Sequence, residues 1–137
     1  MKPTLDHIGI AVRSIEDASI WKDLGLTIDH VETVESQKVT TAFIRVGDAN
    51  LELLEPTGPD STVAGFIEKR GEGIHHICLR VDDIELELEK LQAKGYRLIN
   101  PDPVPGAHGC RVAFLHPAAG HGVLIELSEI AKQDHHD

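Results

Sequence analysis

The sequence is poor in aromatic residues and in cysteine. Aromatic residues make up 4% of its 137 positions, and there are two cysteines. Cys78 and Cys110 are not in a CxxC spacing, which argues against a disulfide framework and against a thiolate zinc site. We therefore expect a reduced, cytoplasmic protein. Its core must be aliphatic, and 41% hydrophobic residues are enough to build one within a single domain.

Basic residues and long apolar runs are also scarce. The chain has 23 acidic and 13 basic residues, and its net charge is -10 at pH 7. Such a surface repels nucleic acid and anionic membranes, so neither is an expected partner. No run approaches the roughly 18 apolar residues of a membrane-spanning helix. A small charged substrate can still be attracted by a local basic patch.

The two halves of the sequence resemble each other. LDHIGIAVRSI near the start aligns with IHHICLRVDDI near the middle, and His7 then matches His76, 69 positions later. Each segment alternates as a strand does and leads into a helical pattern. This self-similarity indicates a duplicated supersecondary unit.

Helical patterns follow both matched segments. Ser14 and Asp83 are suited to cap the two helices, and Gly25 and Gly95 are suited to end them. The residues expected to be buried are Ile15, Ala18, Trp21 and Leu24 in the first helix and Ile84, Leu88 and Leu91 in the second.

Three short strands are predicted after each helix, so each half has the order βαβββ. They span residues 26–34, 39–46 and 51–55 in the first half and 97–99, 111–116 and 122–127 in the second. The stretch NPDPVPGAHG is predicted to be a loop because it is rich in proline and glycine.

These elements describe one α+β domain over residues 1–130. Its two modules span residues 5–56 and 74–129, and residues 57–73 form a linker with a short helix capped by Asp60 or Ser61. Residues 131–137 are polar and are expected to form a disordered tail.

Strand alternation places a histidine and a glutamate of each module on the face away from its helix. In the first strand His7 shares this face with Gly9 and Ala11, and His76 occupies the matching position in the second module. Glu52 and Glu126 point away from the leucines beside them in the closing strand of each module.

Buried carboxylates in aliphatic strands need a partner. An unpaired one costs on the order of several kcal/mol, whereas pairing or metal binding offsets that cost. Taken singly, a strand histidine or glutamate is more often hydrogen-bonded or solvated than a ligand. The repeated placement makes a shared divalent metal ion an equal alternative, and both interpretations stay open at this point.

Five motifs carry a resemblance to a known family. They are LDHIGIAV, NLELLEP, GIHHICLRVDDI, GAHGCRVAFLHP and HGVLIEL, and they extend from Leu5 to Leu127. Together they resemble the methylmalonyl-CoA epimerases of the vicinal oxygen chelate, or glyoxalase, superfamily. The resemblance implies tandem βαβββ modules that form a curved mixed sheet, or cup, around a divalent metal ion. It also implies a homodimer, an acyl-CoA substrate and a place in propionate metabolism.

The resemblance assigns roles to four residues. His7, Glu52, His76 and Glu126 would bind the ion, which could be cobalt, manganese, nickel or zinc. The ion would stabilise the enolate that forms when C2 of methylmalonyl-CoA loses its proton. Glu52 and Glu126 would also be the general acid and base. Some relatives have glutamine in place of Glu52, so Glu52 could be a ligand, a weaker ligand or a base.

Three further residues carry narrower expectations. Thr41 stands where at least one bacterial relative has a glutamate proposed as a base, a role that threonine cannot take. Arg111 is expected to bind the substrate carboxylate or a phosphate of coenzyme A, or else to be a solvated residue at a strand edge. His75 alternates away from His76, and we expect it to pack near a helix or to form a local hydrogen bond.

Two alternative functions follow from the same resemblance. One is another metal-dependent enzyme of the superfamily, such as a lyase, a dioxygenase or a thiol transferase. The other is a binding protein for small molecules on the same fold, without enzymatic activity. Such binders usually need no metal ligands, so the presence of His7, His76 and Glu126 counts against them.

Overall fold

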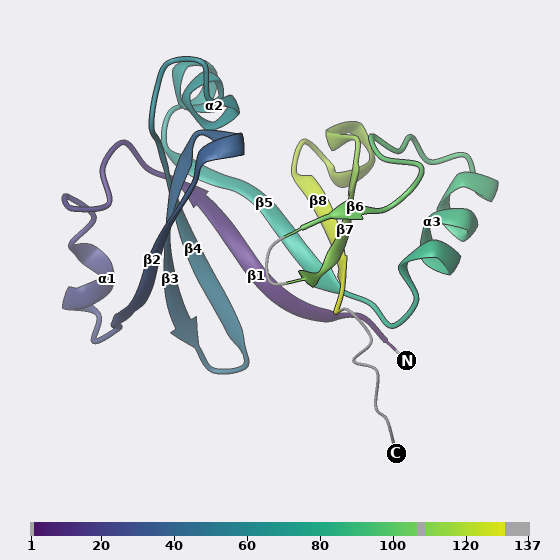
Figure 1. Cartoon of the computed structure of the whole chain (residues 1–137), viewed down its shortest axis with the longest axis horizontal. Coiled ribbons are helices and arrows are strands. Elements are labelled where there is room, and N and C mark those ends of the chain that lie inside the picture. The colour runs from purple at the N-terminus through teal and green to yellow at the C-terminus, as the bar shows by residue number, and fades with distance from the viewer. Residues whose placement is uncertain (1, 107–108, 131–137) are drawn as a thin grey trace. The chain divides into compact units, whose positions relative to one another are not determined.

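The chain, in a computed structural model that describes residues 2–106 and 109–130, divides into two compact units (Figure 1). The N-terminal unit is Asp6–Ile77, and the C-terminal unit combines Met1–Leu5 with Cys78–Asp137. The predicted tail, residues 131–137, lies outside the described residues, and the end of the domain at residue 130 stays a prediction. None of the helices within the described ranges is long and apolar enough to cross a membrane.

The elements follow the predicted order βαβββ twice, with one helix between the modules. The first module contains β1 (Thr4–Ala11), α1 (Ile20–Asp23), β2 (Ile28–Val34), β3 (Val39–Val46) and β4 (Ala49–Pro56), and α2 (Thr62–Arg70) follows it. The second module contains β5 (Gly73–Arg80), α3 (Ile84–Ala93), β6 (Val104–Pro105), β7 (Arg111–Leu115) and β8 (Leu124–Glu129). Short 3-10 turns occupy Glu35–Gln37 and Pro117–Gly120. The α+β class is confirmed.

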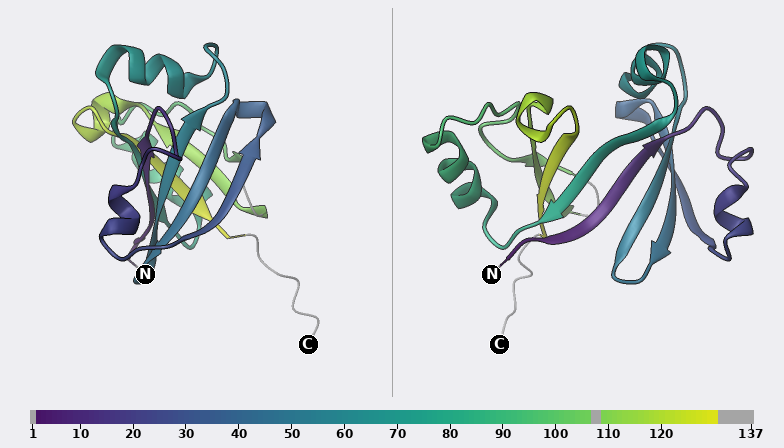
Figure 2. Two further views of the ribbon diagram at one scale, coloured as in Figure 1. Left: turned by 90° about the vertical axis from the view of Figure 1, so that its left-hand side faces the viewer. Right: turned by 180° about the vertical axis from the view of Figure 1, so that it is seen from behind.

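The strands of the N-terminal unit follow the order β2-β3-β4-β1. β1 runs parallel to β4, whereas β3 is antiparallel to both β2 and β4. A two-residue turn at Gly47 and Asp48 joins β3 to β4, and Gly47 has a φ of 57°, which glycine adopts without steric cost. α2 lies across one end of these strands (Figure 2).

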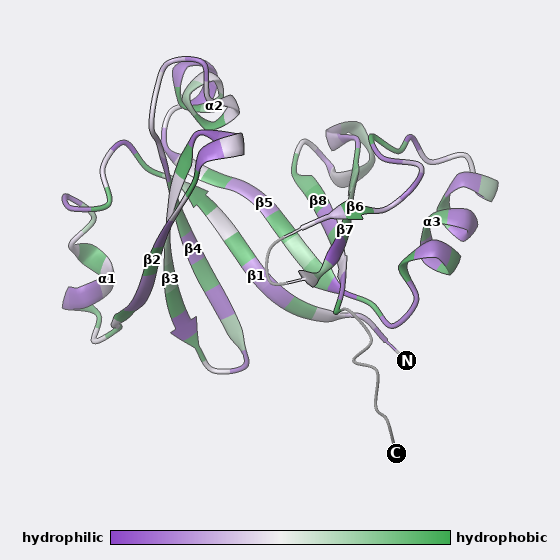
Figure 3. Cartoon of the chain, in the orientation of Figure 1, coloured by the Kyte–Doolittle hydropathy of each residue, from purple (hydrophilic) through white to green (hydrophobic). Residues whose placement is uncertain are grey.

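Each face of this sheet has its own set of buried residues. Val12, Ala42, Ile44 and Leu53 form a core on one face, and Ile15, Ala18 and Trp21 from the segment around α1 pack against it. On the other face Ala11, Val39 and Leu54 pack against Val63 and Ile67 of α2. Hydropathy accordingly alternates along β1 and β4 (Figure 3). Because α2 covers only one end of the second face, polar side chains can occupy the rest of it.

The C-terminal unit repeats this plan with a longer helix. β7 is antiparallel to both β6 and β8. Ile84 and Leu88 of α3 are buried against Ala113 and Leu127 of the strands. Asp83 caps α3 by accepting a hydrogen bond from the Leu86 amide, as predicted, and Ser61 likewise caps α2.

Matching hydrogen bonds confirm the duplication. Both modules tie the residue after the first strand to the closing strand, and both tie the next helical segment to a glutamate. These bonds are Val12 N to Leu54 O and Val81 N to Ser128 O, each 2.9 Å, and Ile15 N to Glu55 Oε1 and Ile84 N to Glu129 Oε2, each 2.7 Å. The carboxylates of Glu55 and Glu129 therefore hold the start of each helical segment.

The prediction of the first helix was wrong in its length. α1 has four residues, and Leu24, expected to be buried, is 65% exposed. The preceding residues form turns instead, because the Asp17 amide donates to Ser14 Oγ and the Ala18 amide to the Ile15 carbonyl. These local bonds compete with the helical pattern.

The prediction for the segment before β7 was also wrong in part. Residues 97–99 form only an isolated bridge, between Leu98 and Leu115. A two-residue strand, β6, lies inside the proline-rich stretch that was predicted to be a loop. Pro105 has no amide hydrogen to donate, so the short strand lacks one possible hydrogen bond at that residue.

Candidate active and metal-binding site

Two buried histidines face each other within the N-terminal unit. His7 on β1 is 9% exposed and His76 on β5 is 8% exposed. Their Nε2 atoms lie 2.9 Å apart, and the rings are perpendicular. Two imidazole nitrogens that bind one ion at a right angle, each about 2.1 Å from it, would be about 3 Å apart. The spacing of this pair therefore fits a shared divalent metal ion.

Gly9 makes room for the His76 ring. A Cβ atom on Gly9 would lie 2.3 Å from Cε1 and 2.5 Å from Nδ1 of His76. Contacts this short cannot exist, so any side chain at position 9 would displace the ring. Gly9 lies on the same face of β1 as His7, and its bare backbone allows His76 to reach across.

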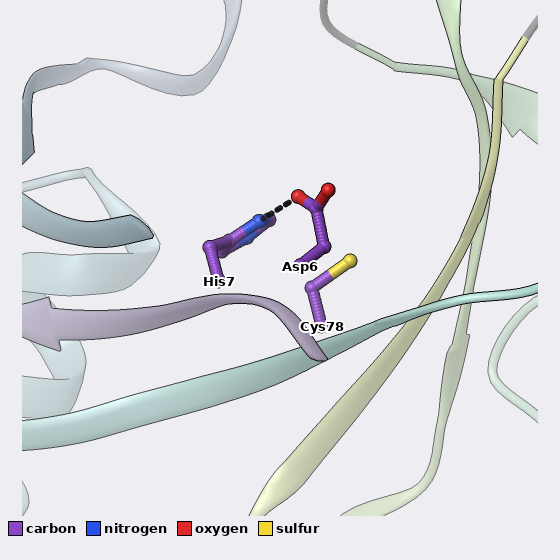
Figure 4. Close-up of side chains that lie close together, drawn as sticks. All are labelled: Asp6, His7 and Cys78. Atoms are coloured by element: carbon purple, nitrogen blue, oxygen red, sulfur yellow. Dashed lines mark hydrogen bonds and ion pairs between the residues drawn. The ribbon is translucent and has the colours of Figure 1, made fainter. Parts of the chain in front are cut away.

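Two carboxylates orient the His7 ring. Figure 4 shows the interaction between Asp6 and His7. Asp6 Oδ2 lies 2.8 Å from His7 Nδ1, and Glu52 Oε2 lies 3.0 Å from the same nitrogen. Carboxylates accept hydrogen bonds, so Nδ1 carries the proton and a neutral ring has its lone pair on Nε2. That lone pair is on the atom that faces His76.

His76 is held in its neutral form. The pKa of His76 is lowered to about 3, first by burial and then by the neighbouring rings of His7 and His75. The imidazole is therefore uncharged near neutral pH and keeps a lone pair for a ligand bond. His75 contacts it through a separation of 2.9 Å between the two Nδ1 atoms, and also packs edge-on against Phe66 of α2.

The two glutamates occupy equivalent positions in their modules. Glu52 on β4 lies directly opposite Phe43 of β3, and Glu126 on β8 lies directly opposite Phe114 of β7. Both are shielded from solvent: the Glu52 side chain is 15% exposed and Glu126 is 9% exposed. The structure thus brings Glu52 together with His7, and places Glu126 in the C-terminal unit beside a matching phenylalanine.

Arg111 is bound by carboxylates of its own unit. Its Nη1 donates to Glu85 and its Nη2 donates to Glu129 Oε1 at 2.9 Å. These two hydrogen bonds, that of Glu85 first, raise the pKa of Arg111 above its usual range. The guanidinium therefore neutralises the buried Glu129, which weakens the expectation that Arg111 binds substrate.

Thr41 is buried on β3, opposite Leu54 of β4 and Glu32 of β2. A hydroxyl group at this position cannot take a proton from carbon, so another residue must be the base.

Sequence reasoning missed three carboxylates. Asp6 stands directly before His7, and this adjacency was the available signal. Glu55 and Glu129 lie at matching positions near the ends of the two closing strands, which comparison of the halves could have found.

A shallow cavity of about 530 Å³ lies elsewhere in the N-terminal unit. Its lining includes Val12, Arg13, Trp21 and Glu72 and excludes His7, Glu52 and His76. It borders the segment around α1, on the side of β1 away from the paired histidines.

Comparison with known proteins identifies the family. Residues 6–114 match the Glyoxalase/Bleomycin resistance protein/Dioxygenase superfamily. The chain belongs to this superfamily. Its predicted fold class and its resemblance to the epimerases within the superfamily are thereby supported.

Individual relatives match more than nine tenths of the chain. The Bacillus subtilis protein YqjC, whose function is uncharacterised, is 46% identical, with 97% of this chain and 96% of that protein aligned. The ethylmalonyl-CoA/methylmalonyl-CoA epimerase of Cereibacter sphaeroides is 38% identical, covering 92% of this chain and 97% of the relative. A solved structure of methylmalonyl-CoA epimerase in complex with methylmalonyl-CoA and NH4+ has a TM-score of 0.86 at 35% identity, covering 96% of each chain. These likenesses confirm the glyoxalase fold class.

Proposed function

We propose that this protein is a metal-dependent epimerase that interconverts the R and S forms of methylmalonyl-CoA at C2. The observation that carries the proposal is the pair of Nε2 atoms of His7 and His76, 2.9 Å apart and both buried. Relatives named methylmalonyl-CoA epimerase support the substrate. Cytoplasmic location and a homodimer are parts of the same proposal, and both rest on the sequence expectations.

His7, His76 and Glu126 would hold the ion. Imidazole nitrogen and carboxylate oxygen form a donor set that suits cobalt, manganese, nickel or zinc. When bound, the ion would act as a Lewis acid that stabilises the negative charge developing on the thioester oxygen of the substrate. Asp6 supports the set by fixing the proton of His7 on Nδ1.

Glu52 would move a proton instead of binding the ion. Its carboxylate contacts His7 Nδ1, the nitrogen that does not face His76. A carboxylate that is not a tight ligand keeps its basicity and can remove the C2 proton. The C–H bond breaks, its electron pair forms the enolate and the proton moves to Glu52. A second acid must return a proton to the opposite face of C2, and as a proposed ligand Glu126 is poorly suited to that step, so we assign no residue to it.

Exchange in heavy water tests this proposal. The metal-loaded protein is incubated with a single epimer of methylmalonyl-CoA, and deuterium at C2 and the ratio of epimers are followed over time. We expect deuterium uptake at C2 and conversion to a mixture of the two epimers to occur together. Ethylmalonyl-CoA is tested in parallel because a relative is named for both substrates. Absence of exchange at full metal occupancy would contradict the proposed function and favour another enzyme of the superfamily.

Metal content separates the ligands from other histidines. His76→Ala should lose bound metal, because it removes one of the paired Nε2 atoms. His30→Ala is the matched control: His30 is on β2 of the same unit, and its side chain is 59% exposed. Equal metal content in both variants would place the ion elsewhere.

A further inference from the structure

Arg45 projects from the same face of the N-terminal sheet as the paired histidines. Its neighbour on β3, Ile44, is fully buried in the core on the face that the segment around α1 covers. Successive side chains of a strand point to opposite faces, so Arg45 points to the other face. Glu52 contacts His7 across that face. Arg45 is exposed there, immediately before the turn at Gly47 and Asp48.

Strand register aligns Arg45 with His7. Arg45 lies directly opposite Asn50 in the antiparallel pair of β3 and β4, and Asn50 lies beside His7 in the parallel pair of β4 and β1. The three residues therefore form one row across neighbouring strands. With roughly 4.8 Å between strands, the backbones of Arg45 and His7 are about 10 Å apart. A long arginine side chain and an acyl-CoA molecule can both span this distance.

Arg45 differs from Arg13 and Lys38 of the same unit because, among the described residues, no carboxylate is paired with its guanidinium. Arg13 pairs with Glu72 at 3.5 Å, and Lys38 pairs with Asp60. Within residues 2–106 and 109–130, no carboxylate lies within 4.0 Å of the Arg45 guanidinium. Its backbone amide donates to Asp29 Oδ2 at 3.0 Å. In a chain with a net charge of -10, this is a local positive charge beside an acidic site.

We propose that Arg45 and Asn50 form an anion-binding subsite for the acyl-CoA substrate, which extends the proposed function and rests on it. The guanidinium fork binds two oxygens of one carboxylate or phosphate, and the Asn50 amide adds a donor in the same row. The anion is either the carboxylate of the malonyl group or a phosphate of coenzyme A. Both offer the same oxygen chemistry, and the test separates them.

The test uses Arg45→Gln, Arg45→Lys and the control Lys22→Gln in the metal-loaded, full-length protein. Lys22 is exposed on α1, whose surrounding segment covers the opposite face of the sheet, and its substitution removes the same charge. Epimerisation is measured with methylmalonyl-CoA and with methylmalonyl-pantetheine, which has no phosphate. For Arg45→Gln we expect KM to rise roughly tenfold with kcat changed by less than about threefold, because the lost contact is equal in ground and transition states. Arg45→Lys keeps the positive charge, so its KM should rise less than that of Arg45→Gln.

The outcomes assign the anion or overturn the subsite. A rise in KM with both substrates identifies the malonyl carboxylate, and a rise with methylmalonyl-CoA alone identifies a phosphate. An unchanged KM with both substrates, or an equal rise in Lys22→Gln, overturns the proposal. Calorimetric titration with methylmalonyl-CoA gives the same comparison without turnover. If the wild-type protein binds methylmalonyl-CoA but does not exchange C2, the proposed function fails. The dissociation constants of the variants then still test the subsite.

Discussion

The two modules begin their helical segments with the same hydrogen bond, yet only the second module builds a long helix there. Glu55 accepts from the Ile15 amide and Glu129 accepts from the Ile84 amide, both at 2.7 Å. α1 then has four residues, starts after Ser19 without a side-chain cap and buries none of them, whereas α3 has ten residues and a capping aspartate, Asp83. The carboxylate anchor thus fixes where a segment starts, and the cap and the buried stripe decide how far a helix continues.

The two anchors, the carboxylates of Glu55 and Glu129, differ in their surroundings. The residue opposite Glu55 is Thr40, whereas the residue opposite Glu129 is Arg111. Glu129 is 5% exposed and Glu55 is only half-buried, so solvent can stabilise the charge of Glu55. The more deeply buried carboxylate, that of Glu129, is paired with Arg111, and this pairing offsets the cost of burying a charge.

The largest expected difference between the modules is at Glu52 and Glu126, the glutamates of the proposed site. Glu126→Gln should lose bound metal, because an amide oxygen binds a divalent ion more weakly than a carboxylate. Glu52→Gln should keep the metal and lower C2 exchange by about 10² to 10⁴-fold, which is typical for loss of a general base. Metal analysis and deuterium exchange on both variants give the comparison. Equal metal loss would show that Glu52 is also a ligand and that the modules are more symmetric than proposed.

An intermediate effect is expected at the anchors. Glu129→Ala leaves the Ile84 amide and Arg111 without their shared acceptor, and we expect the free energy of unfolding to fall by about 1–3 kcal/mol. Glu55→Ala removes a single bond from a half-buried site, so the loss should be smaller, about 1 kcal/mol. Urea unfolding measures both. A larger loss for Glu55→Ala would reverse the ranking and show that the cation at Glu129 adds nothing.

The smallest effect is expected at the caps. Asp83→Ala should lower the free energy of unfolding by about 1 kcal/mol, because the Leu86 amide loses its acceptor at the start of a ten-residue helix. Ser14→Ala should change it by less than about 0.5 kcal/mol, since Ser14 Oγ accepts at 3.3 Å within an exposed turn. Equal losses in thermal or urea unfolding would mean that both residues act as caps.

Sequence alone predicted most of the fold because alternation and duplication are strong signals. The bounds of β3 were predicted as observed, and the stripe of Ile84 and Leu88 was correctly predicted to be buried. The length of α1 was not predictable, since its pattern competes with local turns around Ser14 that only tertiary packing selects. β6 was missed because a strand of two residues has no periodicity to detect.

The site was predictable as a set of residue types, but its hydrogen bonding was not. Alternation singled out His7 and His76, and the structure brings their Nε2 atoms together. Nothing in the sequence says which nitrogen of His7 meets Glu52, because that depends on the rotation of a ring. The partners of Arg111 were equally hidden, since Glu85 and Glu129 are distant in sequence.

Gly9 gives this protein a genetic weak point. One nucleotide change converts a glycine codon to an alanine codon, and here the added methyl group would occupy the space of the His76 ring. The mildest substitution at position 9 should therefore resemble the removal of His76 itself. Random mutagenesis scored for metal binding should recover position 9 together with the histidines, although glycine has no atom that could bind a metal.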